Sequence, residues 1–138
     1  NGLQSIPDGF FHSCKSLVSI NIPNSVVKIG EYAFAGCRSL PDIVLPENLV
    51  NIKERAFRRC LALRCIHIPD SVTHIGGNAF AECQNLAFVR LPQNSHLTID
   101  SNAFSECPSL FQIQLFPTLI MTQQQQQIAI IDDINDCN

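Results

Sequence analysis

One stretch of the chain, residues 63–86, reads LRCIHIPDSVTHIGGNAFAECQNL and contains a complete structural unit. Its Phe80, Cys83 and Leu86 belong to a pattern, Phe-x-x-Cys-x-x-Leu, that recurs in fixed register. The phenylalanines of this pattern are Phe11, Phe34, Phe57, Phe80 and Phe104, at steps of 23, 23, 23 and 24 residues. Such a repeat predicts a solenoid, in which each unit buries its apolar face only against its neighbours.

The unit divides into three parts. Residues 65–68 alternate polar and apolar side chains, which is typical of a strand whose isoleucines point inward. Pro69 ends this segment, because proline cannot donate to a strand ladder. Residues 72–75 predict a second short strand, and Gly76 gives the backbone the freedom that a corner needs. Residues 78–83 combine an Asn cap with good helix formers, and we expect a short helical turn there.

The inward positions recur in every unit and form three columns. They are Ile20, Ile43, Ile66, Val89 and Ile113; Ile22, Leu45, Ile68, Leu91 and Leu115; and Ile6, Ile29, Ile52, Ile75 and Ile99. The sequence therefore predicts a repeat solenoid of about five coils of 23–24 residues, each with short parallel β-strands and one short helical turn. The fifth unit has one extra residue between Pro92 and Ile99, and we expect a bulge in its second strand around residues 95–97.

Five of the seven cysteines occupy the Cys position of the repeat: Cys14, Cys37, Cys60, Cys83 and Cys107. Equivalent positions on successive coils carry parallel side chains, which is a poor geometry for a disulfide. Ligands 23 residues apart also lack the spacing of a zinc site. We therefore expect five reduced thiols packed in the core, where cysteine behaves as a small hydrophobic residue.

The repeat resembles the BspA-like class of leucine-rich repeats, which reads roughly Ile-x-Ile-Pro-x-Ser-Val-x-x-Ile-Gly-x-x-Ala-Phe-x-x-Cys-x-x-Leu. The residues that carry the resemblance are Asn24-Ser25-Val26, Asp70-Ser71-Val72, Ile29-Gly30, Ile75-Gly76 and the Ala-Phe-x-x-Cys cores, between about Leu3 and Leu115. The second unit departs mildly, with Pro41 and Asp42 in its first strand, and the first unit has Gly9-Phe10-Phe11. BspA-like repeats are typical of bacterial surface and adhesion proteins and of large protist families, so the resemblance implies a non-catalytic protein-interaction module.

We divide the chain into a five-repeat solenoid over residues 1–116 and a C-terminal tail over residues 117–138. The tail contains a run of glutamines, residues 123–127, followed by apolar and acidic residues. It is predicted to be disordered or to form a short helix that caps the last coil or binds a partner. Nothing before Leu3 provides a cap, and we expect either that the chain is a fragment or that a partner covers its first coil.

Composition excludes several classes of function. The net charge is -3, and no basic run of the kind that follows a nucleic-acid backbone is present, so we expect no nucleic-acid binding. No apolar stretch approaches the roughly 20 residues that span a bilayer, so we expect no direct membrane insertion. The chain shows no signal peptide, but it begins at Asn1, so the compartment stays open. Reduced core cysteines are compatible with an intracellular site.

The sequence offers little for catalysis. It contains no phosphate loop, no dinucleotide fingerprint and no cluster of metal ligands. His67 and His74 lie on different strands of one unit, and a catalytic triad needs its members on one site. We therefore expect no enzyme activity, no cofactor and no metal.

The outward positions of the first strand of each coil form the candidate protein-binding face. Its residues are Arg64, His67, Phe88, Arg90, Phe111, Gln112 and Gln114. Phe88 and Arg90 stand out, because aromatic and arginine side chains are enriched at binding hot spots. The predicted function is a non-catalytic protein-protein interaction or adhesion module. The alternatives are a structural subunit held in a larger multi-protein assembly and a regulatory appendage of an enzyme.

Overall fold

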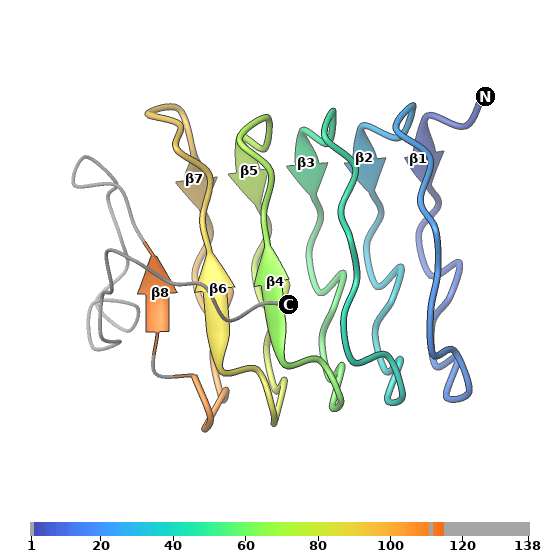
Figure 1. Cartoon of the computed structure of the whole chain (residues 1–138), viewed down its shortest axis with the longest axis vertical. Helices are drawn as coiled ribbons and strands as arrows, with labels where there is room; N and C mark the ends of the chain where they lie inside the picture. The colour runs from blue at the N-terminus through green and yellow to red at the C-terminus, as the bar shows by residue number, and fades with distance from the viewer. Residues whose placement is uncertain (1, 111, 115–138) are drawn as a thin grey trace.

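The computed structural model describes residues 2–110 and 112–114, and within them the chain forms a stack of coils with eight short parallel strands (Figure 1). The strands are β1 (Ser5–Ile6), β2 (Lys28–Ile29), β3 (Asn51–Ile52), β4 (Cys65–His67), β5 (His74–Ile75), β6 (Phe88–Arg90), β7 (Thr98–Ile99) and β8 (Gln112–Gln114). They form a five-stranded sheet, in the order β1-β2-β3-β5-β7, and a three-stranded sheet, in the order β4-β6-β8. The predicted solenoid is confirmed.

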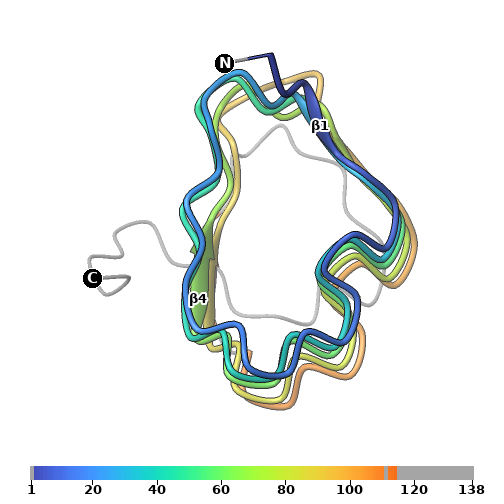
Figure 2. The same ribbon diagram turned by 90° about the vertical axis from the view of Figure 1, so that its right-hand side faces the viewer.

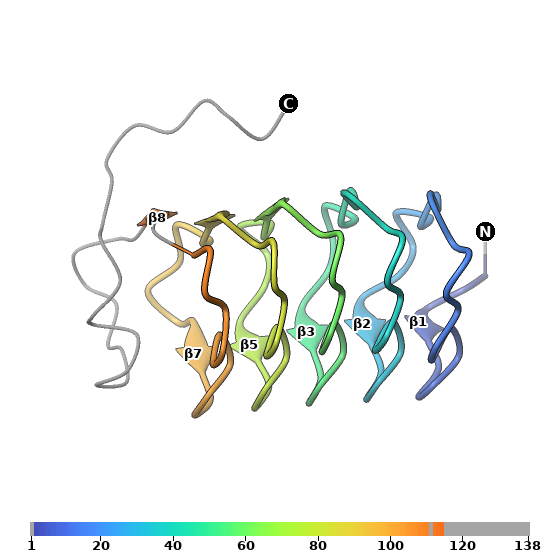
Figure 3. The same ribbon diagram turned by 90° about the horizontal axis from the view of Figure 1, so that it is seen from below.

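Each coil goes once around a closed outline, and successive coils superimpose when the stack is viewed along its axis (Figure 2). The five-stranded sheet and the three-stranded sheet lie on different sides of this outline (Figures 2 and 3). The strand register equals the repeat length, since Ile6 pairs with Ile29 and Ile29 pairs with Ile52. Every side chain therefore lies above its own equivalent in the preceding coil.

The core fills the space between the sheets and is built from the predicted columns. In the third coil, Ile52 is fully buried, Ile66 is 1% exposed and Ile68 is 3% exposed. The same positions are buried in the second and fourth coils. Ile20 is an exception, because it lies in the first coil and is only partly buried against the core. The columns thus identify the inward face correctly within the described residues, and the predicted inward Leu115 lies outside them.

Stacked phenylalanine rings and cysteine thiols form a continuous edge of this core, which we call the Phe–Cys edge. The rings of Phe34 and Phe57 lie 5.2 Å apart at 4°, and those of Phe57 and Phe80 lie 5.1 Å apart at 1°. The Cys60 thiol donates to the backbone oxygen of Phe34 at 3.2 Å, and the same bond recurs from one coil to the next. These contacts explain why both residue types repeat at every step.

The five cysteines of the repeat are free thiols, as expected. Burial, together with the neighbouring Cys14 thiol, raises the pKa of Cys37 from its ordinary value of 9.0 to about 11. Burial also raises the pKa of Cys60, further than that of Cys37. These two thiols therefore stay protonated in the folded chain at neutral pH.

The predicted helical turn is wrong, because residues 2–110 and 112–114 contain no helix. Alternate backbone N–H groups at the turn bond to different partners. Ala33 and Ala35 donate within their own coil, whereas Phe34 and Gly36 donate to Ala56 and Arg58 of the next coil. Two residues per turn also adopt positive φ, such as Arg55 at 57° and Arg59 at 59°. A helix needs successive N–H groups to bond within one segment, so this pattern replaces it.

The predicted bulge in the fifth coil is also not formed. His74 pairs with Thr98 and Ile75 pairs with Ile99 in regular register, so the second strand of this coil continues the ladder. The extra residue lies in the turn before β7, where the His96 N–H donates to the side-chain oxygen of Asn94 at 2.8 Å. A surface turn absorbs an insertion more easily than a strand whose side chains face a packed core.

Candidate functional site

The three-stranded sheet β4-β6-β8 places the candidate face. Ile66, Val89 and Ile113 point into the core, so alternation turns the flanking residues outward. Register pairs His67 with Arg90 and Arg90 with Gln114. The exposed side chains of His67 and Arg90 therefore lie side by side in the third and fourth coils, and the register continues to Gln114 in the fifth.

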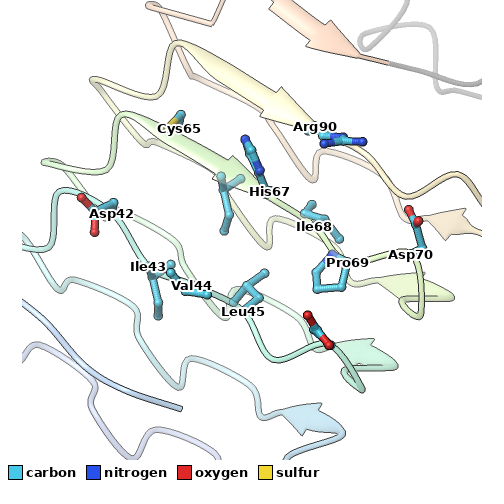
Figure 4. A pocket seen from close by; sticks show the side chains of 12 residues that line it. Asp42, Ile43, Val44, Leu45, Cys65, His67, Ile68, Pro69, Asp70 and Arg90 are labelled. Carbon is cyan, nitrogen blue, oxygen red and sulfur yellow. The ribbon is translucent and has the colours of Figure 1, made fainter. Parts of the chain in front are cut away.

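A depression of about 560 Å³ lies on this face, between the second, third and fourth coils (Figure 4). It is lined by residues 42–45, Glu47, residues 65–70 and Arg90. The segment of the second coil that borders it, residues 42–45, is not a strand, and Pro41 at its entry has no N–H to donate. The ladder of this sheet begins at β4, and the second coil forms an irregular wall beside it, joined to the third coil by the bond from the Arg64 N–H to the Pro41 carbonyl.

The chemistry of the depression is mixed. Val44 is 82% exposed, which is a large exposure for an apolar side chain. Arg90 and His67 are exposed on neighbouring strands, and Figure 4 shows their side chains next to each other. Partial burial and the positive charge of Arg90 lower the pKa of His67, so its imidazole is neutral at neutral pH. Asp42, Glu47 and Asp70 add exposed carboxylates to the lining.

The predicted face residues differ in how far their side chains are exposed. Arg64, His67 and Arg90 are exposed, as expected of outward positions. Phe88 was expected to be exposed, but it is only 4% exposed. Its ring lies 6.2 Å from the imidazole of His67 on the neighbouring strand. Strand alternation predicts the direction of a side chain but not whether a large ring becomes covered, and the expectation for Phe88 was wrong for this reason.

The side chains of three predicted face residues, Phe111, Gln112 and Gln114, are not among those that the structure describes. Phe111 lies outside the described residues. Gln112 and Gln114 belong to β8, in register with Phe88 and Arg90. The predicted tail, residues 117–138, also lies outside the described residues. The contribution of these positions to the face stays a prediction.

The predicted face did not include Val44, Asp42, Glu47 or Asp70. Val44 occupies the same outward column as His67 and Arg90, and an apolar residue at that position was a signal that could have identified it. The acidic residues come from the turns that flank the strands. Their convergence depends on how the coils stack, which the sequence of one unit does not reveal.

Other polar groups form a network on the five-stranded sheet. The imidazole of His74 contacts the carboxylate of Asp100 at 2.9 Å through Nε2 and the side-chain oxygen of Asn51 at 3.3 Å through Nδ1. The three residues belong to three successive coils, so the network joins them. Among the described residues, no three His, Cys, Asp or Glu side chains form a group that could hold a metal ion. That part of the chain also has no helix long and apolar enough to cross a membrane.

Comparison with known proteins agrees with this geometry. The family described as BspA type leucine rich repeat region matches residues 4–126, in six copies. A leucine-rich repeat protein from T. pallidum is 36% identical, with a TM-score of 0.77 over 83% of this chain and 54% of that one. A leucine-rich repeat protein from Bacteroides ovatus is 34% identical, with a TM-score of 0.62 over 82% of this chain and 35% of that one. The chain thus spans about half of the first protein and about a third of the second. A comparison with curated protein sequences gives no match.

Proposed function

Because this chain belongs to the BspA-type leucine-rich repeat family, we propose that it is a non-catalytic protein-interaction or adhesion module that binds its partner on the face of β4, β6 and β8. Leucine-rich repeat proteins generally serve as scaffolds for protein interaction or adhesion. The observation that carries the choice of face is the depression of about 560 Å³ beside Val44, His67 and Arg90.

The side chains in the depression suit a protein partner. Val44 supplies apolar surface that is already exposed to water, so covering it is favourable. Arg90 supplies several donors on a planar group, and arginine is enriched among the residues that dominate binding energy. The neutral imidazole of His67 beside it can donate or accept a hydrogen bond. An apolar side chain flanked by a carboxylate or carbonyl group would complement all three.

The rest of the candidate face would form the rim of such a contact. Arg64 is exposed at the entry of β4, and β8 continues the sheet to the fifth coil with Gln112 in register with Phe88 and Gln114 in register with Arg90. A standard protein interface buries about 800 Å² on each partner, which exceeds the area of one depression. The proposal therefore includes several coils, with the depression as its centre.

The test compares two double variants in binding to a panel of immobilised candidate proteins. His67→Ala with Arg90→Ala alters the face, whereas Lys28→Ala with Lys53→Ala alters the side of the five-stranded sheet. Phe88→Ala is avoided because Phe88 is buried, and its loss would mix destabilisation with lost contacts. Circular dichroism first establishes that both variants are folded.

For any protein that the wild-type chain binds, the first variant is expected to weaken affinity by about tenfold or more, the effect of losing a hot-spot residue. The control is expected to bind as the wild type does. Equal affinity of the wild type and the His67/Arg90 variant would refute the choice of face. A greater loss in the control would move the contact to the five-stranded sheet.

We propose as a second candidate a structural subunit of a larger assembly, which exposed apolar residues of the first coil favour. Phe10 is 63% exposed, Val18 is 62% exposed and Leu3 is 44% exposed. Large exposed apolar surface commonly marks a contact with another chain. Light scattering and thermal melting of the purified chain distinguish the two functions. A monomer that melts cooperatively would contradict an obligate assembly, whereas aggregation without a partner would support it.

A further inference from the structure

A second depression, of about 210 Å³, lies at the turns of the first three coils, away from the face of β4. Its lining consists of His12, Ser13, Tyr32, Ala35, Gly36, Arg38, Arg58 and Arg59. The second coil places Ala35 and Gly36 at the positions that hold His12 and Ser13 in the first coil and Arg58 and Arg59 in the third. The depression exists because Ala35 has only a methyl group and Gly36 has no side chain, whereas the first and third coils carry larger side chains at these positions. We call it the arginine pocket.

The arginine pocket carries an excess of positive charge. Arg58 donates to the carboxylate of Glu82 through Nε at 2.9 Å, and Arg59 lies 3.4 Å from the other oxygen of the same carboxylate. Arg38 has no ion-pair partner within residues 2–110 and 112–114. Three guanidinium groups therefore line the pocket, and one carboxylate, that of Glu82, pairs with two of them. The chain as a whole has a net charge of -3, so the excess is local to this pocket.

The charge is also confined along the stack. In the column of Ser13, Gly36 and Arg59, the fourth and fifth coils carry Glu82 and Glu106. Glu54 is the acidic residue of the third coil nearest in sequence to Arg58 and Arg59, and its carboxylate forms an ion pair with Arg55 at 2.8 Å. Positive charge thus collects over the second and third coils, and negative charge follows beyond them.

The pocket retains unused hydrogen-bond donors at fixed positions. The hydroxyl oxygen of Tyr32 accepts from Arg55 at 2.7 Å, which leaves its own O–H able to donate. Arg59 contacts Glu82 through Nε, so its terminal N–H groups remain available. By contrast, the backbone N–H groups of Gly36 and Ser13 already donate to Arg58 and Ala35. A ligand would therefore be held by side chains, above all by guanidinium groups.

Backbone geometry fixes the Cα positions from which these side chains extend. Tyr32, Gly36 and Arg59 adopt positive φ values of 56°, 75° and 59° in turns that hydrogen bond to the neighbouring coil. The guanidinium group of Arg55 packs over the Tyr32 ring, with its central carbon 5.4 Å from the centre of that ring. Groups that are already ordered lose less entropy when a ligand binds.

We propose that the arginine pocket binds a phosphate or sulfate group. The planar fork of arginine matches the oxygens of such anions and forms charge-assisted bonds with them. A volume of 210 Å³ is several times the roughly 30 Å³ that one water occupies in the liquid, so a tetrahedral anion fits. Its two negative charges would balance the excess of two positive charges that remains when the one carboxylate of Glu82 is set against three arginines. The proposal is independent of the protein-binding face, which lies on β4, β6 and β8.

The test is a titration of the whole chain with sodium phosphate, sodium sulfate and sodium acetate, near neutral pH and at constant ionic strength. Amide signals in the nuclear magnetic resonance spectrum report the binding at Tyr32, Gly36 and Arg59. We expect saturable shifts with phosphate, with sulfate or with both, and weaker binding of acetate, which carries one charge. Tighter binding of phosphate than of sulfate would assign the pocket to phosphate ligands, and the reverse would assign it to sulfate ligands.

Two double variants with the same change of net charge complete the experiment. Arg38→Ser with Arg59→Ser is expected to weaken the binding by about tenfold or more, because each charged hydrogen bond contributes strongly. Arg64→Ser with Arg90→Ser removes the same charge from the other face and is expected to change it by less than about twofold. Shifts that do not saturate, or equal losses in the two variants, would overturn the proposal. Acetate binding as tight as that of phosphate and sulfate would also overturn it.

Discussion

The Phe–Cys edge is nearly identical from coil to coil, whereas the face of β4, β6 and β8 changes at every step. Along the edge, neighbouring rings stay 5.1–5.3 Å apart, and the thiols of the second to fifth coils each donate to the phenylalanine carbonyl of the preceding coil. On the face, the outward column runs through Asn21, Val44, His67 and Arg90. A position repeats where a side chain packs against its own copy, and it varies where the side chain faces solvent or a partner.

Removing one ring from the Phe–Cys edge should have the largest effect on stability. Phe57→Ala should lower the free energy of unfolding by about 3–5 kcal/mol, because Phe57 is fully buried between two other rings. Phe10→Ala is a matched control, since Phe10 is 63% exposed, and it should cost less than about 1 kcal/mol. Urea denaturation measures both. Similar costs for the two substitutions would mean that the edge does not hold the stack together.

The two glycines that follow β5 test how tightly successive coils approach. A Cβ atom on Gly76 would lie 2.5 Å from the backbone nitrogen of Glu54, whereas one on Gly77 would lie 3.5 Å from its nearest neighbour. Lys53 and Asp100 occupy the Gly76 position in adjacent coils, so the backbone there can adjust at a cost. Gly76→Ala should therefore lose about 1–3 kcal/mol of stability, and Gly77→Ala should be close to neutral. Thermal melting of the two variants measures these effects, and Gly76→Ala should lower the melting temperature more than Gly77→Ala.

Alkaline pH should weaken the edge while leaving the face unaffected. Burial raises the pKa of Cys37 from 9.0 to about 11, so the folded chain keeps a proton that the unfolded chain releases. The stabilisation is complete below pH 9 and is lost as pH rises from about 9 towards 11. We expect the free energy of unfolding to fall more steeply over this range in the wild type than in Cys37→Ala. Parallel pH profiles for the two chains would contradict a protonated core thiol.

The smallest effect is expected on the variable face. His67→Ala and Arg90→Ala remove exposed side chains, so each should change the stability by less than about 0.5 kcal/mol. Urea denaturation of the double variant measures this directly. A loss comparable to that of Gly76→Ala would show that the face is part of the structural framework and would weaken its assignment to partner binding.

The same contrast explains what the sequence could reveal. The inward isoleucine columns, the strand register and the free thiols follow from a repeat in which like residues stack on like residues. The helical turn could not be corrected from the sequence, because good helix formers at residues 79–82 do not show that alternate N–H groups donate to the neighbouring coil. Strand alternation gave the outward direction of Arg90 correctly but not the burial of Phe88. The two depressions depend on several coils at once, such as Ala35 and Gly36 between longer side chains.

The alternating hydrogen bonds at the turns have a mechanical consequence. Each coil is joined to the next by a similar set of bonds that run along the axis of the stack, such as those from Phe34 to Ala56 and from Phe57 to Ala79. Tension applied to the two ends would load these sets in series, and the coil at one end would peel away before its neighbours. Each rupture would release about 23 residues, or roughly 75–80 Å of extended chain. A single molecule pulled in an optical trap should therefore lengthen in nearly equal steps, each of which corresponds to the unfolding of one coil.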